Sequence, residues 1–255
     1  MIDISIVMPV YNLEKHISSS LKTIKHVLDS SFPSYELVVV DDGSHDGTLH
    51  VLENEESLDA RVRVISYMQN QGKGYAIKMG VRHSCGKIIA FVDGDLEVSP
   101  NVLREYVNEL KSSDVVVASK SHPLSKRNFP KSRRFLSWTF NLVVRIALGI
   151  KVKDTQTGLK LGTATVMRKI FGIMLIKRFA FDVELLTIAT ALGLRIKELP
   201  IEVNSTSHGM KVREILRMFL DVVAISYRFR IIRWYQRQLC LKAPEESINA
   251  TIWKA

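Results

Sequence analysis

The segment Lys87-Ile88-Ile89-Ala90-Phe91-Val92-Asp93-Gly94-Asp95 decides the fold, because an apolar run ends there in two carboxylates separated by one glycine. The run from Lys87 to Val92 is short and apolar, which predicts a buried parallel strand. Asp93 and Asp95 then follow its carboxyl end, where open α/β sheets bind ligands. Neighbouring carboxylates repel each other unless a cation lies between them, and such oxygen ligands suit Mg²⁺ or Mn²⁺ held together with substrate phosphates. We therefore expect a metal and phosphate site; the alternative is a polar turn in which Asp93 caps the next helix.

The first half of the chain alternates short apolar runs with helical patterns, which predicts an α/β fold with a mostly parallel sheet and crossover helices. Five strands are expected, at Ile4 to Met8, Tyr35 to Val40, Val62 to Ser66, Lys87 to Val92 and Asp114 to Ala118. Polar or glycine-rich residues follow each of the first four strands: Tyr11-Asn12, Asp41-Asp42, Gln69 to Gly74, and the Asp93/Asp95 pair. Such loops meet at one edge of the sheet, and with Lys73 they suit a nucleotide and its diphosphate. The sequence lacks the P-loop and G-x-G-x-x-G signatures, so neither a P-loop ATPase nor a dinucleotide dehydrogenase is favoured.

Positive charge is concentrated in two segments of this 255-residue chain, whose net charge is +10. The segment Lys120 to Arg134 holds six basic residues and no acid. The segment Lys211 to Arg237 holds seven basic residues against Glu214 and Asp221. Clustered positive charge indicates a polyanionic partner, which is nucleic acid, anionic lipid or a phosphorylated substrate.

Cysteine content and hydropathy favour a reducing compartment and no membrane span. Cys85 and Cys240 are the only cysteines in the sequence, so no disulfide framework is expected. The sequence begins with an apparent strand, which does not resemble a signal peptide. The most apolar stretch, Phe135 to Ile150, is interrupted by Arg145 and is too short to cross a bilayer. We expect a peripheral protein on the cytoplasmic face of a membrane, without a transmembrane segment.

A helix predicted to begin at Arg134 has an unusual composition. Its polar residues follow helical spacing and form one narrow stripe: Arg134, Ser137, Asn141 and Arg145. Nearly every other position is apolar, and Trp138 suits a membrane interface. The pattern fits a core helix with one wet edge equally well. The adjacent basic loop favours the membrane interpretation, with a lipid phosphate held at a membrane surface.

A second long helical pattern runs from Val212 to Gln238 and mixes arginines with aromatic and aliphatic residues, including Trp234 and Tyr235. A solvated helix, or one that faces nucleic acid, is the simpler alternative. The interspersed apolar residues favour binding at the level of lipid headgroups. We therefore divide the chain into a catalytic domain at 1–210, an amphipathic membrane-surface segment at 211–240, and a tail at 241–255 for which the sequence predicts no role.

Four motifs resemble those of the family 2 glycosyltransferases of the GT-A fold, in the same order and spacing. They are Val7-Met8-Pro9-Val10-Tyr11-Asn12, Val40-Asp41-Asp42-Gly43-Ser44-His45-Asp46-Gly47-Thr48, Gly72-Lys73-Gly74, and Asp93-Gly94-Asp95. Three later segments resemble the polyprenyl-phosphate glycosyltransferases, and among them dolichyl-phosphate β-glucosyltransferases more than the mannose-transferring relatives. These segments are Asp154-Thr155-Gln156-Thr157-Gly158-Leu159-Lys160, Phe181-Asp182-Val183-Glu184-Leu185-Leu186 and Gly209-Met210-Lys211. The resemblance covers about Ile4 to Arg230.

The resemblance implies a role for individual residues of each motif. The nucleotide is expected to contact Pro9, Tyr11, Asp42, Lys73 and Asp93, and the metal to contact Asp95 and Asp93, with Asp95 as the more direct ligand. The sugar is expected to contact Asp154 and Gln156. The acceptor phosphate is expected to contact Lys120, Arg134, Ser137 and Lys211. The expected catalytic set is Asp93, Asp95, Asp182 and Gln156.

The function expected from this set is inverting transfer of a hexose, glucose from UDP-glucose being favoured, to a polyprenyl phosphate such as dolichyl phosphate. The acceptor is a phosphate monoester that already carries negative charge at neutral pH, so no strong general base is required. Asp182 is therefore assigned to positioning the sugar or the acceptor, with a helix cap as the alternative. The competing hypotheses are a mannosyltransferase that uses GDP-mannose, addition of a sugar to a lipid-linked saccharide, and a catalytically silent module that binds anionic surfaces. We expect Mg²⁺ or Mn²⁺ as cofactor, a membrane surface as partner, and no nucleic acid.

Overall fold

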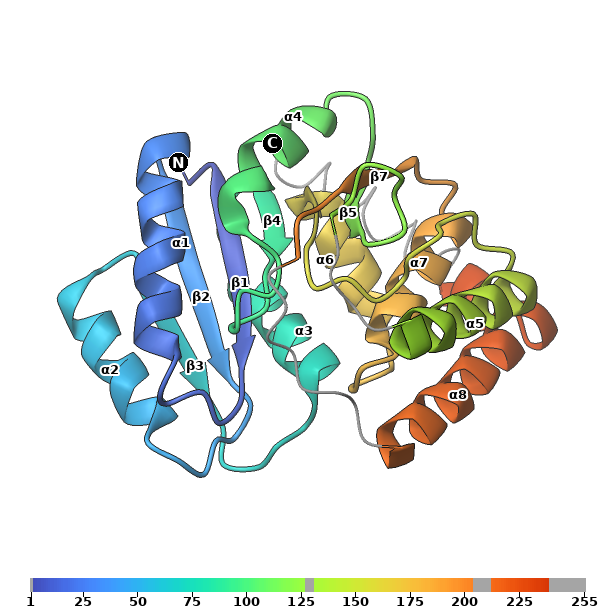
Figure 1. Cartoon of the computed structure of the whole chain (residues 1–255), viewed down its shortest axis with the longest axis horizontal. Helices are drawn as coiled ribbons and strands as arrows, with labels where there is room; N and C mark the ends of the chain where they lie inside the picture. The colour runs from blue at the N-terminus through green and yellow to red at the C-terminus, as the bar shows by residue number, and fades with distance from the viewer. Residues whose placement is uncertain (1, 127–130, 204–211, 239–255) are drawn as a thin grey trace, which may run out of the picture.

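A seven-stranded sheet with the strand order β3-β2-β1-β4-β6-β5-β7 runs through the computed structural model (Figure 1). The structure describes residues 2–126, 131–203 and 212–238. The strands are β1 (Ile4–Val10), β2 (Tyr35–Asp41), β3 (Val62–Ser66), β4 (Ile88–Phe91), β5 (Val115–Ser119), β6 (Lys160–Thr163) and β7 (Ile196–Pro200). The five strands expected in the first half are all present, and β6 and β7 are additions that the sequence analysis did not predict.

The sheet is parallel except at β6, so the expected mostly parallel sheet is confirmed. Strand β1 pairs in parallel with both β2 and β4, and β5 pairs in parallel with β7. Strand β6 runs antiparallel between β4 and β5, with Lys160 opposite Phe91 and Gly162 opposite both Ile89 and Val115. This register places Lys160 beside the end of β4, close in the chain to Asp93.

Helices cover both faces of the sheet. The helical elements are α1 (Ile17–Ser31), α2 (Thr48–Leu58), α3 (Lys73–His83), η1 (Pro100–Val102), α4 (Leu103–Glu109), α5 (Lys131–Leu148), α6 (Ala164–Ile173), α7 (Phe181–Ala191), α8 (Val212–Ser226) and η2 (Tyr227–Ile231). Helices α1, α2 and α4 pack on one face, and α3, α6 and α7 pack on the other. Helices α5 and α8 contact each other outside the second layer, at the right of Figure 1.

Two apolar cores result from the alternation of side chains along the strands. All seven residues of β2 are buried; Val38 and Val40 join the core under α3, whereas Leu37 and Val39 join the core under α1. Burying one such aliphatic side chain stabilises the fold by about 1.5–3 kcal/mol. The sheet is therefore a rigid platform for the loops at its carboxyl edge.

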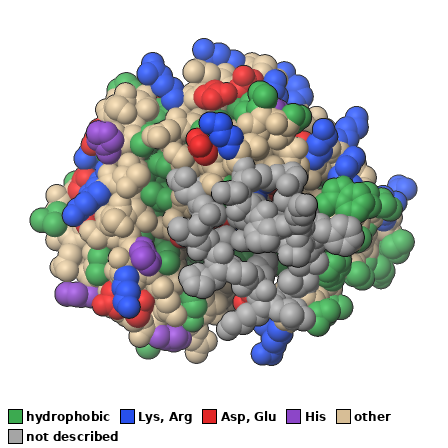
Figure 2. Space-filling view, viewed as in Figure 1, with side chains coloured by type: hydrophobic (Ala, Val, Ile, Leu, Met, Phe, Trp, Pro, Cys, Tyr) green, Lys and Arg blue, Asp and Glu red, His purple; other side chains and the backbone are tan. Residues whose placement is uncertain are grey.

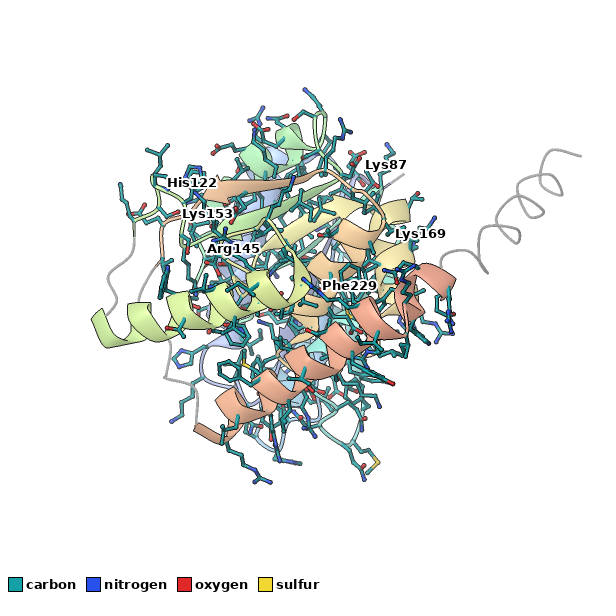
Figure 3. All side chains as sticks on the ribbon, turned by 90° about the vertical axis from the view of Figure 1, so that its right-hand side faces the viewer. Lys87, His122, Arg145, Lys153, Lys169 and Phe229 are labelled. Atoms are coloured by element: carbon teal, nitrogen blue, oxygen red, sulfur yellow. The ribbon has the colours of Figure 1, made fainter. Side chains whose placement is uncertain are left out.

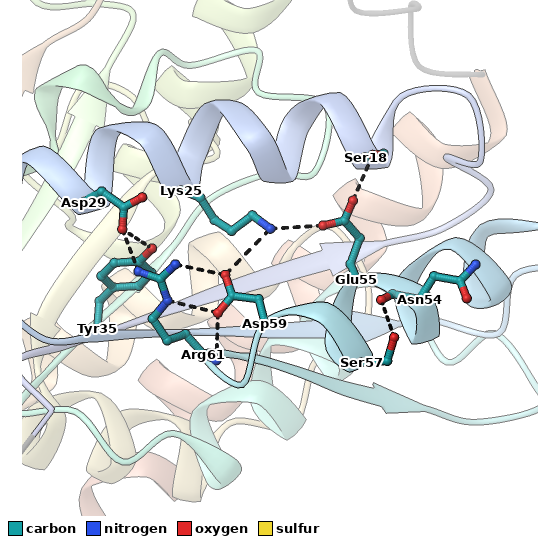
Figure 4. Close-up of polar contacts among 9 residues, drawn as sticks. All are labelled: Ser18, Lys25, Asp29, Tyr35, Asn54, Glu55, Ser57, Asp59 and Arg61. Carbon is teal, nitrogen blue, oxygen red and sulfur yellow. Dashed lines mark hydrogen bonds and ion pairs between the residues drawn. The ribbon is translucent and has the colours of Figure 1, made fainter.

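A polar cluster joins α1, α2 and the start of β3 on the surface (Figure 4). Lys25 Nζ lies 3.0 Å from Glu55 Oε2 and 3.7 Å from Asp59 Oδ2. Arg61 forms ion pairs with two carboxylates: its Nε lies 2.9 Å from Asp59 Oδ1, and its Nη1 lies 2.6 Å from Asp29 Oδ1. These pairs fix the outer helices against the edge strand, and their residues do not belong to the cavity described below.

The second long helical pattern does not form one helix, which corrects the expectation for Val212 to Gln238. Helix α8 ends at Ser226 and continues as the π-helix η2 to Ile231. The chain then turns at Arg233, whose φ is +48°, and residues 234–238 are helical again. The turn returns Tyr235 to the core, where its side chain is fully buried. Tyr235 is thus a core residue here, and not an aromatic residue facing lipid headgroups.

Candidate active site

A cavity of about 510 Å³ opens at the carboxyl edge of the strands, the lower edge of the sheet in Figure 1. The first half of the chain contributes Pro9, Tyr11, Asp42, Lys73, Asp93 and Asp95 to its wall. The second half contributes Arg178, Phe179, Glu214, Arg217, Met218 and Asp221. The predicted meeting of the loops after β1, β2, β3 and β4 at one edge is therefore confirmed.

Asp42 holds the loop between β3 and α3 at one side of the cavity. Its Oδ1 accepts hydrogen bonds from Tyr67 Oη at 2.7 Å and from the Gln71 amide at 2.9 Å. Its Oδ2 accepts from the Gly72 amide at 2.9 Å. Gly72 needs its φ of +101° to turn into α3, and a Cβ there would lie 2.6 Å from the carbonyl of Lys177. The predicted nucleotide residue Asp42 therefore shapes the loop that carries Lys73.

Tyr11 lies beside this loop, at the end of β1. Its side chain is 42% exposed, and its ring meets His45 edge-on with centroids 6.3 Å apart. Asn12, with φ +52°, accepts a hydrogen bond from the His45 amide on its side-chain oxygen. An accessible aromatic ring at the cavity wall is suited to contact with a nucleotide base.

Asp93, Asp95 and Lys73 meet at one side of the cavity. Lys73 Nζ lies 2.6 Å from Asp93 Oδ1. Burial alone would lower the pKa of Lys73, but the negative charges of Asp93, Asp182 and Asp95 raise the pKa overall. Burial and the charge of Asp93 raise the pKa of Asp95 above its usual value. Asp95 accepts the Glu97 amide at 3.2 Å, and this local turn leaves Asp95 accessible at the cavity.

Asp93 fits into space that a glycine leaves. A Cβ on Gly158 would lie 2.0 Å from Asp93 Oδ2, a distance no side chain tolerates. The carboxylate therefore packs directly on the backbone of the loop before β6. Asp93 does not cap the next helix, because Ser99 does so by accepting the Asn101 amide. The strand therefore ends in a polar turn, as the alternative expected, but Asp93 does not cap the next helix.

Asp182 lies in the first turn of α7, and its carboxylate faces Lys160 at 2.5 Å. The side chain of Asp182 is 6% exposed and that of Lys160 is 0% exposed. Burial raises the pKa of Asp182, and the charges of Lys160 and Lys73 oppose this shift. Ala180 occupies the cap position without a side-chain hydrogen bond, so Asp182 is not a helix cap.

The loop before β6 contains the two predicted sugar residues in different settings. Asp154 is 3% exposed and accepts hydrogen bonds from the Lys120 amide, the Gln156 amide and Thr157 Oγ1. Gln156 is half-buried, and its side-chain amide points toward Met218 of α8, 3.7 Å from the sulfur. Asp154 therefore holds the loop together, and Gln156 reaches toward a cavity residue.

The predicted acceptor residues are only partly described. Lys120 Nζ lies 3.2 Å from Glu97 Oε1, close in the chain to Asp95. Ser137 is exposed near the start of α5, and its carbonyl accepts a hydrogen bond from Asn141 Nδ2. The side chain of Arg134 and all of Lys211 lie outside the described residues.

The polar stripe expected on α5 is a wet edge only in part: Ser137 and Arg145 are exposed, whereas Asn141 is buried. Asn141 is 4% exposed and accepts bonds from the amide and hydroxyl of Thr155 on its Oδ1. The exposed side chains of the helix include apolar ones, with Trp138 at 60% and Ile146 at 70%. Arg145 is exposed at the other end of the helix (Figure 3). The two hydrogen bonds from Thr155, a residue outside this helix, explain why Asn141 faces inward.

An apolar groove of about 560 Å³ lies between α5 and α8, which run side by side in Figure 3. Val143 and Ala147 of α5 line it together with Leu216, Phe219, Leu220 and Val223 of α8. Phe140 and Phe219 meet edge-on across the two helices with centroids 5.3 Å apart. Hydrophobic side chains gather at the right of Figure 2, where these helices lie in Figure 1. This groove was not predicted as a feature of the site.

The second-half wall of the cavity was also missed by the sequence analysis. Glu214, Arg217, Met218 and Asp221 line the cavity at spacings of three, one and three residues along α8. This spacing was a usable signal, because residues i, i+3, i+4 and i+7 share one face of a helix. Arg178 and Phe179 precede the Phe181-Asp182 motif and carried no separate signal.

No cluster of three or more His, Cys, Asp or Glu side chains that could hold a metal occurs within residues 2–126, 131–203 and 212–238. A cation at Asp95 must therefore complete its coordination with substrate oxygens or water. Across the same described ranges, none of the helices combines the length and the apolar character that crossing a bilayer demands.

Comparison with known proteins places these motifs in context. Residues 5–182 match the model of the family described as glycosyl transferase family 2. A dolichyl-phosphate beta-glucosyltransferase of Trichomonas vaginalis is 33% identical over 89% of this chain and 72% of its own length. The human dolichyl-phosphate beta-glucosyltransferase is 32% identical over 92% of this chain and 78% of its own length.

The solved structures that resemble this chain share its fold at lower identity. Glucosyl-3-phosphoglycerate synthase from Mycobacterium tuberculosis, in complex with Mn²⁺, UDP-glucose and phosphoglyceric acid, aligns with a TM-score of 0.66 at 21% identity. That alignment covers 88% of this chain and 78% of the synthase. The same enzyme in complex with UDP aligns equally well, at 22% identity. The likeness confirms the expected GT-A fold.

Proposed function

Since this chain belongs to glycosyl transferase family 2 and is a glycosyltransferase, we propose that it transfers glucose from UDP-glucose to dolichyl phosphate and gives a β-linked product. The names of its relatives support this donor and acceptor class. The structural observation that carries the proposal is the position of α8. One face of this helix lines the polar cavity, and another lines the apolar groove.

An acceptor of this class has a charged head and a long apolar chain, and α8 offers a surface to each. Arg217 lies on the face of α8 that lines the cavity, whereas Leu220 lies on the face that lines the groove. A phosphate in the cavity has Arg217 and Arg178 as charge partners. Isoprene units that follow the phosphate gain about 0.8 kcal/mol for each methylene buried in the groove.

The donor is held by the loops of the first half. We propose that Pro9, Tyr11 and Asp42 form the base and ribose site, because Pro9 and Tyr11 line the cavity and Asp42 fixes its loop. Lys73 presents its ammonium to the diphosphate while it neutralises Asp93. As the bond to the sugar breaks, the leaving nucleoside diphosphate gains negative charge, and Lys73 stabilises this charge.

The acceptor phosphate attacks the anomeric carbon on the face opposite the leaving group, which inverts the configuration. Its second pKa is near 6, so it is already an anion at neutral pH and needs no general base. The burial of Asp182 beside Lys160 agrees with this, since a carboxylate so enclosed is poorly placed to accept a proton from an acceptor. We assign Asp182 to positioning, and Gln156, with the loop that Asp154 holds, to the sugar.

The residues at the cavity fit a divalent cation such as Mg²⁺ or Mn²⁺ when the substrate supplies further ligands. Asp95 is an accessible carboxylate, whereas Asp93 pairs with Lys73 through Oδ1 and packs on the backbone of Gly158 through Oδ2. Such a cation would offset the charge of the leaving diphosphate. We propose Asp95 as the direct protein ligand and Asp93 as its neighbour.

The acceptor phosphate and the membrane complete the proposal. Lys120, Arg134, Ser137 and Lys211 remain candidates for contact with the acceptor phosphate. Exposed apolar residues on α5 and α8, including Trp138, Leu216 and Leu220, support a peripheral position on a membrane surface, and we propose its cytoplasmic face.

The experiment that tests the function follows labelled sugar into organic-extractable product. Purified protein receives dolichyl phosphate with Mg²⁺ or Mn²⁺ and either UDP-glucose or GDP-mannose. Label from UDP-glucose alone is expected. Label from GDP-mannose alone would show that the transferred sugar is mannose, and it would leave the proposed acceptor unchanged. The absence of label from both donors would reject the proposed reaction and favour a module that binds anionic surfaces.

A matched pair of variants tests the groove. Leu220→Ser removes an apolar side chain that is 70% exposed and lines the groove, and it should raise the KM for dolichyl phosphate roughly tenfold. Leu58→Ser removes an even more exposed leucine, at 83%, on α2. The Leu58 variant should leave the KM unchanged, and equal effects of the two would argue against the groove as the prenyl site.

A further inference from the structure

Lys160 is a lysine whose side chain has no contact with solvent. It lies on β6 opposite Phe91, and its side chain is 0% exposed. Its Nζ lies 2.5 Å from Asp182 Oδ1 and 2.6 Å from the carbonyl oxygen of Thr157. The same atom lies 5.6 Å from the ring centre of Phe91. Placing an ammonium in such a site costs several kcal/mol unless its partners are well positioned.

The partners of Lys160 belong to segments that surround Asp93. Thr157 directly precedes Gly158, whose backbone packs against the Asp93 carboxylate. Phe91 is the last residue of β4 and lies two residues before Asp93 in the chain. The ammonium of Lys160 therefore joins the loop before β6, the end of β4 and the start of α7 at one point.

Charges alternate from this point to the cavity. Lys160 pairs with Asp182, and Lys73 pairs with Asp93. Asp182 also interacts electrostatically with Lys73, and Lys73 with Asp95. With these five groups ionised, three carboxylates face two ammonium groups, and the row carries one excess negative charge. Loss of the Lys160 charge would leave Lys73 as the single cation among the three carboxylates of this row.

We propose that Lys160 is a positioning residue for the transfer reaction, because it satisfies Asp182 and so leaves Lys73 free to hold Asp93 and the donor diphosphate. Without it, Asp182 competes with Asp93 for Lys73, and Lys73 is drawn away from the diphosphate. The proposal rests on the chain being a glycosyltransferase, but not on the identity of the sugar or of the acceptor. Lys160 itself does not touch substrate.

The test uses the full chain and four variants: Lys160→Met, Lys160→Arg, Asp182→Asn, and the double variant K160M/D182N. Affinity for UDP and GDP is measured by calorimetry without acceptor, and kcat and KM are measured with whichever donor the wild type uses. We expect Lys160→Met to weaken nucleoside diphosphate binding about tenfold and to lower kcat/KM about a hundredfold. Lys160→Arg, which keeps the charge, should recover most of both losses.

The double variant separates positioning from simple loss of stability. If Lys160 acts through Asp182, K160M/D182N should match Asp182→Asn in both binding and kcat/KM, because the competing carboxylate is gone. This comparison remains available if Lys160→Met fails to fold, since the double variant carries no unpaired buried charge. Additive losses in the double variant, or wild-type binding and kinetics in a folded Lys160→Met, would overturn the proposal.

A distant lysine serves as the control for charge removal. Lys25→Met deletes an ammonium that pairs with Glu55 at 3.0 Å on the outer helices (Figure 4). It should leave nucleotide affinity and kcat/KM at wild-type values. If the wild type transfers sugar from no donor, the proposed reaction fails, but the affinities for UDP and GDP still decide the role of Lys160.

Discussion

Replacing Tyr235 by phenylalanine should destabilise the fold in a way that the structure makes calculable. The hydroxyl of Tyr235 donates to Glu184 Oε1 at 2.5 Å, and both side chains are fully buried. Glu184 Oε2 accepts the amides of Leu175 and Ile176, which lead into the loop carrying Arg178 and Phe179 to the cavity. A hydrogen bond to a charged group contributes about 1.5–3 kcal/mol. We therefore expect Tyr235→Phe to lower the free energy of unfolding by about 2 kcal/mol and the Tm by about 4–8 °C.

The loss should depend on pH, because burial raises the pKa of Glu184 while the Tyr235 hydroxyl opposes the shift. A carboxyl with a raised folded-state pKa contributes stability that is present below its unfolded pKa and is lost as pH rises through the folded pKa. Removing the hydroxyl raises that pKa further. The difference in the free energy of unfolding between variant and wild type should therefore grow as pH rises through the folded-state pKa values of Glu184 in the two proteins, level off above them, and shrink toward pH 4.

Urea unfolding at pH 4 and pH 7 measures this prediction, with unchanged m-values as the sign that the two-state model holds. Tyr227→Phe is the control, since Tyr227 is 55% exposed on η2 in the same part of the chain. It should change the free energy of unfolding by less than about 0.5 kcal/mol. Equal stabilities of Tyr235→Phe and wild type at pH 7 would show that the C-terminal segment is not anchored as described.

The remaining predictions concern the cavity and the outer helices. Gly158→Ala places a Cβ 2.0 Å from Asp93 Oδ2 and should lower kcat about a hundredfold in steady-state transfer assays, whereas retained activity would show that the loop yields. Asp95→Asn should reduce transfer to background, because the proposed metal loses its direct ligand. Its thermal unfolding should stay near that of the wild type, because among the described residues the Asp95 side chain accepts a hydrogen bond from the Glu97 amide only. Arg61→Ala should lower the free energy of unfolding by less than about 1 kcal/mol at pH 7. Hydrogen bonds from Arg61 lower the pKa of Asp59 in the folded protein. The effect of the substitution should therefore vanish in unfolding experiments at a pH below that folded-state pKa.

The first half of the fold was predictable because its signals are local. The apolar run before Asp93 and the bounds of β3 at Val62–Ser66 follow from short periodic patterns bounded by polar residues. Strand β6 was not predictable on this basis. Its four residues include Lys160 and Gly162, and they form a strand because the space between β4 and β5 accepts them. Tertiary pairing, and not intrinsic propensity, determines this element.

The candidate site, like the fold, has one part that the sequence predicts and another that only the structure reveals. Asp42, Lys73 and Asp93 follow predicted strands, so their convergence is a consequence of parallel topology. The faces of α5 and α8 required the structure, since a helix that is apolar on most sides does not reveal which neighbour each side meets. Asn141 points inward because it accepts hydrogen bonds from Thr155, and Arg217 lines the cavity because one face of α8 forms part of the cavity wall.

The position of α8 gives the proposed reaction a way to bind the charged head and the apolar chain of one acceptor close together. Arg217 and Leu220 are three residues apart, which is about 4.5 Å along the axis, and they lie on adjoining sides of the helix, where the face that lines the cavity meets the face that lines the groove. In the proposed reaction, a phosphate beside Arg217 would leave only the first isoprene units to pass from the cavity to the groove. The chain beyond those units extends past the groove, toward the exposed apolar side chains of α5 and α8. The proposed arrangement would confine the contacts that select the acceptor to its phosphate and the first units of its chain, with the remainder in the lipid of the proposed membrane surface.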